Sequence, residues 1–356
     1  MLRCHGSQMS LTAAIMFVLG CASAEHEAQE RAAPDAGGSS NPAPDPHARK
    51  LATSASHSCA LRASGVYCWG ANEAGQLGDR TTTSSQTPVQ AQVEASDIVE
   101  LAVHTGRSCA RRSTGRLACW GTNESGQLGD GMRSASPAPV EPALDDAAQL
   151  ALSETTGCAL RTDGSVSCWG GSPDDASDEG SLTPVDVAGV EEALELVGGP
   201  MNTYCVRGET FTRCFQLNGG AWSDPIELPD LAAASSIALA SAQEVCGIVS
   251  GEVVCTEVTG GSRAQLNGSR GTIQLAGGLL TLCGGDIVGT WYCWNILSPM
   301  VLAAIGAPRT ELSRGPFDEL ATAGFRYCGL APSGAVSCLE RNTASPAWSD
   351  VADLPE

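Results

Sequence analysis

The chain of 356 residues contains 40 Asp and Glu against 20 Lys and Arg, so its formal net charge at pH 7 is −20. A surface this acidic repels phosphate backbones, which argues against nucleic acid as a partner. The 41 Gly and 19 Pro indicate a fold rich in turns and poor in long helices.

The N-terminal residues are typical of an export signal. A basic residue, Arg3, precedes the apolar run Leu11–Leu19, which is too short to span a bilayer but suits a secretion signal. The run leads into Val-Leu-Gly-Cys, which resembles the bacterial lipobox, where the signal is cut before a cysteine that carries diacylglycerol. We therefore expect residues 1–20 to be a lipoprotein-type signal peptide and Cys21 to be lipidated. Ordinary cleavage after Ala22–Ala24 is the alternative, and it also exports the protein.

Residues 21–49 are predicted to form a disordered tether. They lack aromatic residues and are rich in Ala, Pro, Gly, Ser and acidic residues. Such a segment cannot bury enough apolar surface to offset its chain entropy. The folded part is therefore expected to begin at residue 50.

The sixteen cysteines follow a spacing that marks repeats. Two of them, Cys4 and Cys21, lie in the signal or directly after it, and the other fourteen form seven pairs with members nine or ten residues apart. Successive pairs begin 37 to 50 residues apart, as in stacked structural repeats. The even number is typical of an exported, fully oxidised protein. The pairs are Cys59 and Cys68, Cys109 and Cys119, Cys158 and Cys168, Cys205 and Cys214, Cys246 and Cys255, Cys283 and Cys293, and Cys328 and Cys338.

Each pair fits the two strands of a β-hairpin. In the third copy (CALRTDGSVSCWG), a three-residue loop ending in Gly164 suits a tight turn and places Cys158 opposite Cys168. Opposite Cα atoms in an antiparallel pair are close enough for a disulfide. The spacing therefore predicts one cross-strand disulfide in each of seven hairpins.

Metal and redox roles fit this spacing less well. Zinc ligands usually come as C-x₂₋₄-C, and catalytic redox cysteines as C-x-x-C. We therefore expect no metal and no cofactor, and we expect the cysteines to staple the hairpins.

The segments around each hairpin complete a four-stranded unit. A short strand with a Leu-Ala or Leu-x core precedes each hairpin, and a strand led by proline follows most of them, as at Pro88 and Pro139. Seven such units arranged radially make an all-β, seven-bladed β-propeller of four-stranded antiparallel blades. We expect the propeller to span residues 50–356, with repeats at about 50–97, 98–147, 148–193, 194–235, 236–271, 272–317 and 318–356.

The first repeats resemble a known family. HSCALRASGVYCWGANEAGQLGD (His57–Asp79) and SCARRSTGRLACWGTNESGQLGDG (Ser108–Gly131) are similar to repeats of the regulator of chromosome condensation family, whose fold is a seven-bladed propeller. The third repeat follows the pattern up to Gly170 and replaces the GQLG loop by PDDASDEG (Pro173–Gly180). In repeats four to seven the resemblance fades to the cysteine pair and the preceding Leu strand.

The residues of this pattern are expected to have structural roles. Its glycines suit turn angles that other residues resist, its glutamines are expected to bond backbone atoms between blades, and its tryptophans to pack between sheets. These residues are Gly75, Gly78, Gly126, Gly129, Gln76, Gln127, Trp69, Trp120 and Trp169. His57 is expected to be packed or hydrogen-bonded rather than to act as a base.

No catalytic signature stands out in the sequence. The motifs GxSxG and HExxH, the P-loop and the Rossmann fingerprint are absent, and the acidic pairs Asp145-Asp146 and Asp174-Asp175 suit solvated loops. We therefore expect no enzyme activity, with a site assembled from distant loops on one propeller face as the less favoured alternative.

A binding scaffold at the bacterial cell envelope is the leading hypothesis. Loops that differ between repeats, such as residues 80–86 and 174–179, suit recognition of a protein or an envelope polymer. We expect a monomer that contacts the membrane through its lipid anchor alone, either an outer-membrane or cell-surface lipoprotein or a periplasmic or secreted protein.

Two other classes stay open. The first class, implied by the family resemblance, is a protein inhibitor of an extracytoplasmic enzyme. An inhibitor would need exposed aromatic anchors, for which Trp222, Trp291 and Trp348 are candidates. A purely structural envelope protein is the second. The family's founding activity, nucleotide exchange on a nuclear GTPase, conflicts with the export signal and the acidic charge.

Overall fold

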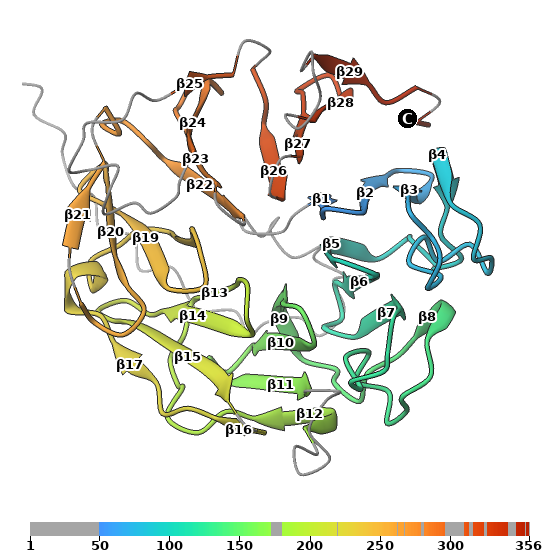
Figure 1. Ribbon diagram of the computed structural model, residues 1–356, viewed down its shortest axis with the longest axis horizontal. Helices are drawn as coiled ribbons and strands as arrows, with labels where there is room; N and C mark the ends of the chain where they lie inside the picture. Colours follow the sequence, from blue (N-terminus) through green and yellow to red (C-terminus); the bar gives the residue numbers. More distant parts are fainter. Residues whose placement is uncertain are drawn as a thin grey trace, which may run out of the picture. The chain divides into compact units, whose positions relative to one another are not determined.

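The computed structural model describes residues 50–171, 180–218, 220–261, 263–266, 268–278, 281–295, 310–312, 316–323, 326–340, 347–352 and 354–355, which belong to one compact unit, Pro42–Glu356. These residues form seven antiparallel sheets arranged as a ring of blades (Figure 1). The predicted fold class, an all-β seven-bladed propeller of four-stranded blades, is confirmed. The predicted lipidation site, Cys21, and the loop at residues 172–179 lie outside the described residues.

In each blade the first strand is the innermost and the last is the outermost (Figure 1). The strands of the first three blades are β1 (Leu51–Thr53), β2 (His57–Arg62), β3 (Gly65–Gly70), β4 (Ser85–Gln90); β5 (Ile98–His104), β6 (Arg107–Arg112), β7 (Leu117–Gly121), β8 (Ser136–Val140); and β9 (Ala147–Leu152), β10 (Thr156–Arg161), β11 (Val166–Gly170), β12 (Ser181–Asp186). Those of the fourth and fifth blades are β13 (Glu195–Gly198), β14 (Thr203–Arg207), β15 (Thr212–Asn218), β16 (Ala221–Trp222), β17 (Ile226–Glu227); and β18 (Ile237–Leu239), β19 (Glu244–Val249), β20 (Glu252–Glu257), β21 (Arg263–Gln265), with the 3-10 helix η1 (Pro229–Leu231) between them. Those of the last two are β22 (Gln274–Gly278), β23 (Thr281–Gly285), β24 (Trp291–Asn295), β25 (Thr310–Glu311); and β26 (Glu319–Ala323), β27 (Arg326–Leu330), β28 (Val336–Glu340), β29 (Trp348–Asp350).

The two central strands of every blade are joined by a disulfide. The strand register places the two cysteines of each pair directly opposite each other, as Cys158 opposite Cys168. Their Cα atoms are 4.0–4.1 Å apart in all seven disulfides. The hairpins are therefore cross-linked at their centres, in the pairing that the cysteine spacing predicts.

The hydrophobic core lies between blades rather than within them. Seven clusters of buried apolar side chains occur, one at each interface between neighbouring blades, and each disulfide contributes to one of them. Because a neighbour covers each face of a central strand, most residues of that strand are buried, and Cys, Ala, Ser and Gly are frequent there. A single blade could not bury its faces alone, so stability depends on the whole ring.

The family tryptophans pack at these interfaces, as predicted. Trp120 lies in the cluster between the first two blades, and its indole N–H donates to the backbone carbonyl of Gln76 at 2.8 Å. Trp169 bonds the Gln127 carbonyl in the same way at 2.9 Å. Trp294 packs between blades five and six, but its Nε1 finds no hydrogen-bond partner among the described residues.

The prediction for the two glutamine side chains was wrong. The side-chain oxygens of Gln76 and Gln127 accept from Ala74 and Ser125 within their own loops, and it is the glutamine backbone carbonyls that bond the next blade. The side chain holds the loop in shape, and the turn then aims the carbonyl at the tryptophan. Gly78 has φ +73° in this turn, and a Cβ there would lie 2.7 Å from the Trp120 Nε1, so the loop requires glycine.

The outer strands also differ from the prediction that a proline leads them. In the first blade, β4 begins at Ser85, and Pro88 lies inside it. The register of β3 with β4 shifts between Cys68 and Gly70, so Pro88 lies in an irregular stretch of the outer strand. A proline is tolerated there because the sheet does not need a backbone N–H from it. In the fourth blade the outer strand is split into β16 and β17, which both pair with β15.

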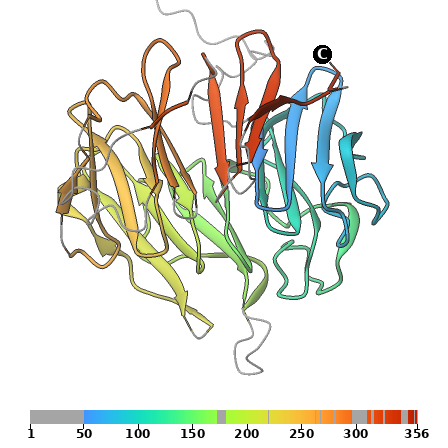
Figure 2. The ribbon, with the colours of Figure 1, turned by 45° about the horizontal axis from the view of Figure 1, so that its top comes forward.

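The ring closes without exchange of a strand between its ends. The first blade contains only residues from the start of the described chain and the seventh only residues from its end, and the two lie side by side (Figure 2). Leu51, Ala60 and Trp69 pack against Cys328 and Val336 at this interface. Closure therefore rests on side-chain packing and hydrogen bonds.

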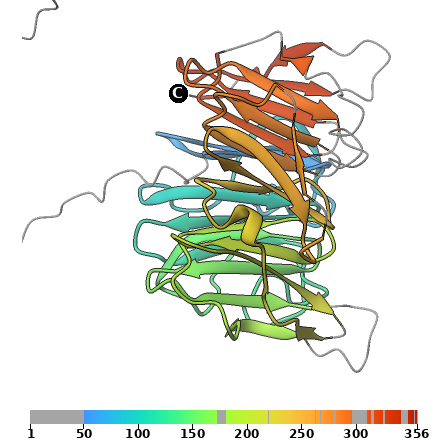
Figure 3. The same cartoon turned by 90° about the vertical axis from the view of Figure 1, so that its left-hand side faces the viewer.

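The propeller has two faces between which all the strands run (Figure 3). Antiparallel pairing places the start of each first strand and the turn between the second and third strands at the same end of the sheet, as Arg62 opposite Gly65 and Leu51 opposite Ala60 show. We call this end the hairpin face and the opposite end the loop face. In the described part of the chain, no helix is long and apolar enough to cross a membrane.

Candidate functional site

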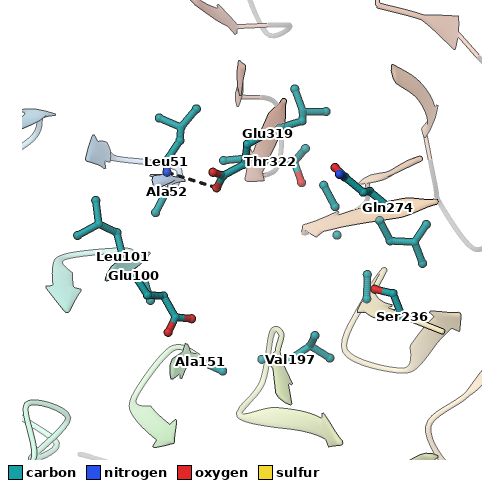
Figure 4. Close-up of a pocket in the computed structure, with 18 of the residues that line it drawn as sticks. Leu51, Ala52, Glu100, Leu101, Ala151, Val197, Ser236, Gln274, Glu319 and Thr322 are labelled. Atoms are coloured by element: carbon teal, nitrogen blue, oxygen red, sulfur yellow. Dashed lines mark hydrogen bonds between the residues drawn. The ribbon is translucent and has the colours of Figure 1, made fainter. Parts of the chain in front are cut away.

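A central channel of about 680 Å³ is lined by the innermost strands. Each blade contributes a polar residue at the hairpin-face end and, two positions later, Ala or Val, so the side chains ring an open centre (Figure 4). The polar residues are Lys50, Glu100, Gln149, Glu195, Ser236, Gln274 and Glu319, and the small ones are Ala52, Ala102, Ala151, Val197, Ala238, Ala276 and Ala321. We call the seven polar residues the polar ring.

Members of the polar ring bond the backbone of the next blade. Glu319 accepts from the Leu51 N–H at 3.3 Å across the closing interface (Figure 4), and its other oxygen accepts from the Lys50 N–H at 3.0 Å. Gln149 accepts from the Leu196 N–H at 2.8 Å. Glu100 and Glu195 make the corresponding bonds to Leu150 and Ile237. The ring therefore holds blades together.

Two carboxylates of the polar ring also form buried ion pairs. Glu100 lies opposite Arg111 in the strand register and Glu195 opposite Arg207, with N···O distances of 2.6 and 2.8 Å. All four side chains are nearly inaccessible to solvent. Because these carboxylates are paired and hydrogen-bonded, the channel mouth offers little for acid–base catalysis.

A second buried polar group lies at the opposite end of the sheets. The His57 ring bonds the Ser54 hydroxyl at 3.0 Å and the Ser108 hydroxyl of the second blade at 2.7 Å. Complete burial lowers the pKa of His57 to about 3, so the ring is neutral at physiological pH. His57 is thus hydrogen-bonded within the core, as expected.

Arg107 takes the corresponding strand position in the second blade, a role that was not predicted from the sequence. The fully buried guanidinium donates to the carbonyls of Gln127, Ser153 and Thr156. Burial lowers its pKa to about 10, which leaves it charged at pH 7. The alignment of HTGRSCA with ASHSCA in the sequence was the signal for this role.

Of the three tryptophans considered as exposed anchors, Trp291 is buried, and Trp222 and Trp348 are half-buried and packed on other aromatic rings. Trp291 is buried, and its N–H donates to the Phe317 carbonyl at 3.1 Å. Trp348 packs on Phe317 with ring centroids 5.1 Å apart, and Trp222 meets Tyr204 edge-on at 5.8 Å. Their aromatic surface therefore contributes to blade interfaces.

The acidic residues singled out in loops do not form a site either. Asp146 pairs with Arg161 and Asp145 is exposed, while Asp174 and Asp175 lie outside the described residues. Within the described ranges, no group of three or more His, Cys, Asp or Glu side chains could hold a metal ion.

The hairpin face presents turns whose tip residues vary from blade to blade. The two residues at the tip of each hairpin turn differ in every blade: Ala63–Ser64, Ser113–Thr114, Thr162–Asp163, Glu209–Thr210, Ser250–Gly251, Ile287–Val288 and Pro332–Ser333. Exposed carboxylates surround them in the turns and in the segments that lead to the next blade. These are Glu94, Glu141, Asp145, Asp163, Glu191, Glu192, Glu209 and Asp318. The face is thus rigidly supported, acidic and different in each blade.

Comparison with known proteins relates the first repeats to one family. The model of the regulator of chromosome condensation (RCC1) repeat matches residues 48–76 and 64–110. RCC1 domain-containing protein 1 of Homo sapiens is 36% identical over 88 residues, which cover 24% of this chain and 23% of that relative. The match thus spans about a quarter of each protein.

Solved propellers share the fold over most of the chain. Prp20p from Saccharomyces cerevisiae, described with its binding properties to Gsp1p and histones, has a TM-score of 0.59 and 18% identity over 77% of this chain and 80% of its own. The ectodomain of the Physcomitrella patens receptor kinase CR4 has a TM-score of 0.54 and 19% identity over 82% and 73% of the two chains. PorZ, a bacterial surface component of the type-IX secretion system of Porphyromonas gingivalis, has a TM-score of 0.56 and 9% identity. The match covers 86% of this chain and 38% of PorZ. At these identities the likeness concerns the fold alone.

Proposed function

The chain carries repeats of the regulator of chromosome condensation family, and from that premise we propose that it is a protein-binding scaffold exported to the bacterial cell envelope. One observation carries the proposal. A frame stapled by seven disulfides and by the polar ring presents exposed turns that differ in every blade. Such a rigid support with a divergent surface suits recognition, because little conformational entropy is lost on binding.

The disulfides support the proposed location. Seven disulfides indicate an oxidising compartment. The apolar run Leu11–Leu19 and the following Cys21 favour a lipid-anchored protein at the outer membrane or cell surface, with a periplasmic or secreted form as the alternative. The chain enters the propeller at Lys50, beside Glu319 at the hairpin-face end of the channel. A tether over residues 21–49 would therefore leave from the hairpin face.

The partner class follows from charge and surface. We propose a monomer that binds a protein or envelope polymer and neither nucleic acid nor a cofactor, because the net charge is −20 and the ring carboxylates are engaged in internal bonds. We propose no enzyme activity on the same ground. The alternative of a protein inhibitor loses one tryptophan candidate, the buried Trp291, and keeps Trp222 and Trp348 only as half-buried residues of outer strands.

A capture experiment with the full chain tests this proposal. The protein, purified from the cell that makes it, is immobilised and incubated with that cell's envelope extract, and a variant with reduced, alkylated cysteines serves as the unfolded control. We expect envelope proteins bound in a stoichiometric amount to the oxidised chain alone. A single stoichiometric enzyme whose activity is lost would favour the inhibitor, and equal capture by the unfolded control would refute the scaffold.

A further inference from the structure

One hairpin turn of the hairpin face is apolar. Of the seven turns, all within the described residues, six carry polar, small or proline residues at the tip, and the sixth blade carries Ile287 and Val288. Their exposed fractions are 84% and 68%, the two highest among the exposed large hydrophobic residues of the described chain. Two adjacent aliphatic side chains are thus held in solvent.

The backbone of this turn does not require them. In four blades the turn has the same two hydrogen bonds, which in the sixth are Asp286 N–H to Thr290 O at 3.0 Å and Gly289 N–H to Asp286 O at 3.1 Å. The other three place Ser113–Thr114, Thr162–Asp163 and Pro332–Ser333 at the positions of Ile287–Val288. Serine, threonine, aspartate and proline are the residues that such turns favour, whereas β-branched aliphatic residues are not. A function other than folding therefore accounts for the Ile-Val pair.

The turn is rigidly fixed to the propeller. Asp286 Oδ1 accepts from the N–H groups of Val288 and Thr290 at 3.0 and 2.9 Å. Phe317 N–H donates to the Gly289 carbonyl at 3.1 Å, which ties the turn to the segment leading into the seventh blade. The backbone of the turn is therefore fixed, so little backbone entropy is lost when a partner buries the two side chains.

A third exposed aliphatic residue lies at the base of the same hairpin. Ile273, with 51% exposed, precedes β22, and its N–H donates to the Gly285 carbonyl at 2.9 Å at the foot of the same hairpin. Exposed apolar groups that are surrounded by polar residues mark protein interaction sites.

The charge around the turn indicates which kind of apolar partner, a lipid surface or a protein pocket, the turn would bind. Asp318 is exposed beside the turn, and exposed carboxylates continue around the hairpin face. The exposed carboxylates of this face outnumber its exposed arginines, such as Arg116 and Arg270, so the face repels an anionic lipid surface. A protein whose apolar pocket lies in a basic surface matches both the aliphatic tip and the acidic surroundings.

We propose that the Ile287–Val288 turn is the anchor by which the hairpin face docks into an apolar pocket on a basic protein. This inference rests on the proposed scaffold function and specifies where that scaffold binds. The partner buries the two side chains at the centre of the interface and pairs its basic rim with the carboxylates of the neighbouring turns and linkers.

Site-specific photocrosslinking of the full chain in the cell that makes it tests the proposal. A benzophenone amino acid is placed at 288 and, in separate variants, at 114 in the equivalent turn of the second blade and at 132 on the loop face. We expect a discrete protein adduct from position 288, which mass spectrometry then identifies. Adducts from position 132 without any from 288 would overturn the inference and leave the scaffold function standing. Lipid adducts at 288 would also overturn it, and no protein adduct from any position would overturn both.

The identified partner is then purified for affinity measurements. The double substitution I287S/V288T gives the sixth blade the tip residues of the second, in a turn with the same backbone hydrogen bonds, so the fold is retained. We expect the affinity of this variant to fall about thirtyfold, which is about 2 kcal/mol at 1.4 kcal/mol per tenfold. We also expect the Kd of the unmodified chain to rise with added salt. The matched control S113A/T114A should bind like the unmodified chain. Unchanged affinity of I287S/V288T, or an equal loss in the control, would refute the anchor.

Discussion

Glu195 links the fourth and fifth blades through one carboxylate. One oxygen pairs with Arg207 at 2.8 Å, and the other accepts from the Ser236 hydroxyl at 2.9 Å and the Ile237 N–H at 3.3 Å. In Glu195→Ala all these bonds are lost, and the largely buried Arg207 cation is left without its carboxylate. Breaking a buried ion pair from one side costs about 3–5 kcal/mol, and we expect this loss in the free energy of unfolding.

The third blade supplies the matched comparison for this pair. There Gln149 occupies the position of Glu195 and bonds the Leu196 N–H, and it lies opposite Leu160 rather than an arginine. The double substitution Glu195→Gln with Arg207→Leu gives the fourth blade the same pair. This double variant keeps the inter-blade acceptor and leaves no unpaired charge. We therefore expect its free energy of unfolding to lie within about 1.5 kcal/mol of that of the unmodified protein, and each single substitution to be more destabilising.

Guanidinium unfolding of the oxidised full chain, followed by circular dichroism and tryptophan fluorescence, measures these differences. Glu191→Gln, an exposed residue of the same face, is the control and should change stability by less than about 0.5 kcal/mol. A double variant as unstable as Glu195→Ala would refute the reasoning, since it would mean that the ion pair within the fourth blade contributes net stability that the inter-blade hydrogen bond cannot replace.

Three further comparisons use matched positions in different blades. Trp120→Phe removes an indole hydrogen bond and should cost about 1 kcal/mol more in unfolding free energy than Trp294→Phe, whose Nε1 has no partner among the described residues; equal losses would contradict this. Gly78→Ala should be at least about 1 kcal/mol more destabilising than Gly251→Ala in thermal unfolding, because both have positive φ but the new Cβ meets Trp120 only at Gly78. Burial lowers the pKa of His104 to about 3, so between pH 6.5 and 3 the unfolded chain binds a proton that the folded protein does not, and stability falls as pH is lowered. His104→Gln should flatten this decline by up to about 1.4 kcal/mol per pH unit, and an unchanged pH profile would contradict the assignment.

The blade architecture was predictable because it rests on local patterns. Cysteines nine or ten residues apart around a turn are compatible with few structures other than a cross-strand pair, and they mark blades four to seven where the family motif has faded. The packing of Trp120 and Trp169 was predictable for the same reason, since each follows a cysteine whose place in the hairpin was set by spacing.

The hydrogen bonds between blades were not predictable from local pattern. The polar residue before each inner-strand Leu, such as Gln149, acts on the neighbouring blade, whose position follows from the rotation between blades. The Gln76 side chain was misassigned because a turn, not the side chain, aims its backbone carbonyl at Trp120. The Ile287–Val288 tip became informative only when the turns of four blades could be superimposed by their hydrogen bonds.

The proposed export and the stapled blades both depend on the seven cysteine pairs being oxidised within their own hairpins. Peptide mapping of the protein from its native cell, alkylated and digested without reduction, tests this most directly. We expect seven disulfide-linked species, each containing the two cysteines of one hairpin, from Cys59 with Cys68 to Cys328 with Cys338. Alkylated thiols in most pairs, or disulfides that join different hairpins, would contradict both the oxidising location and the stapled blades.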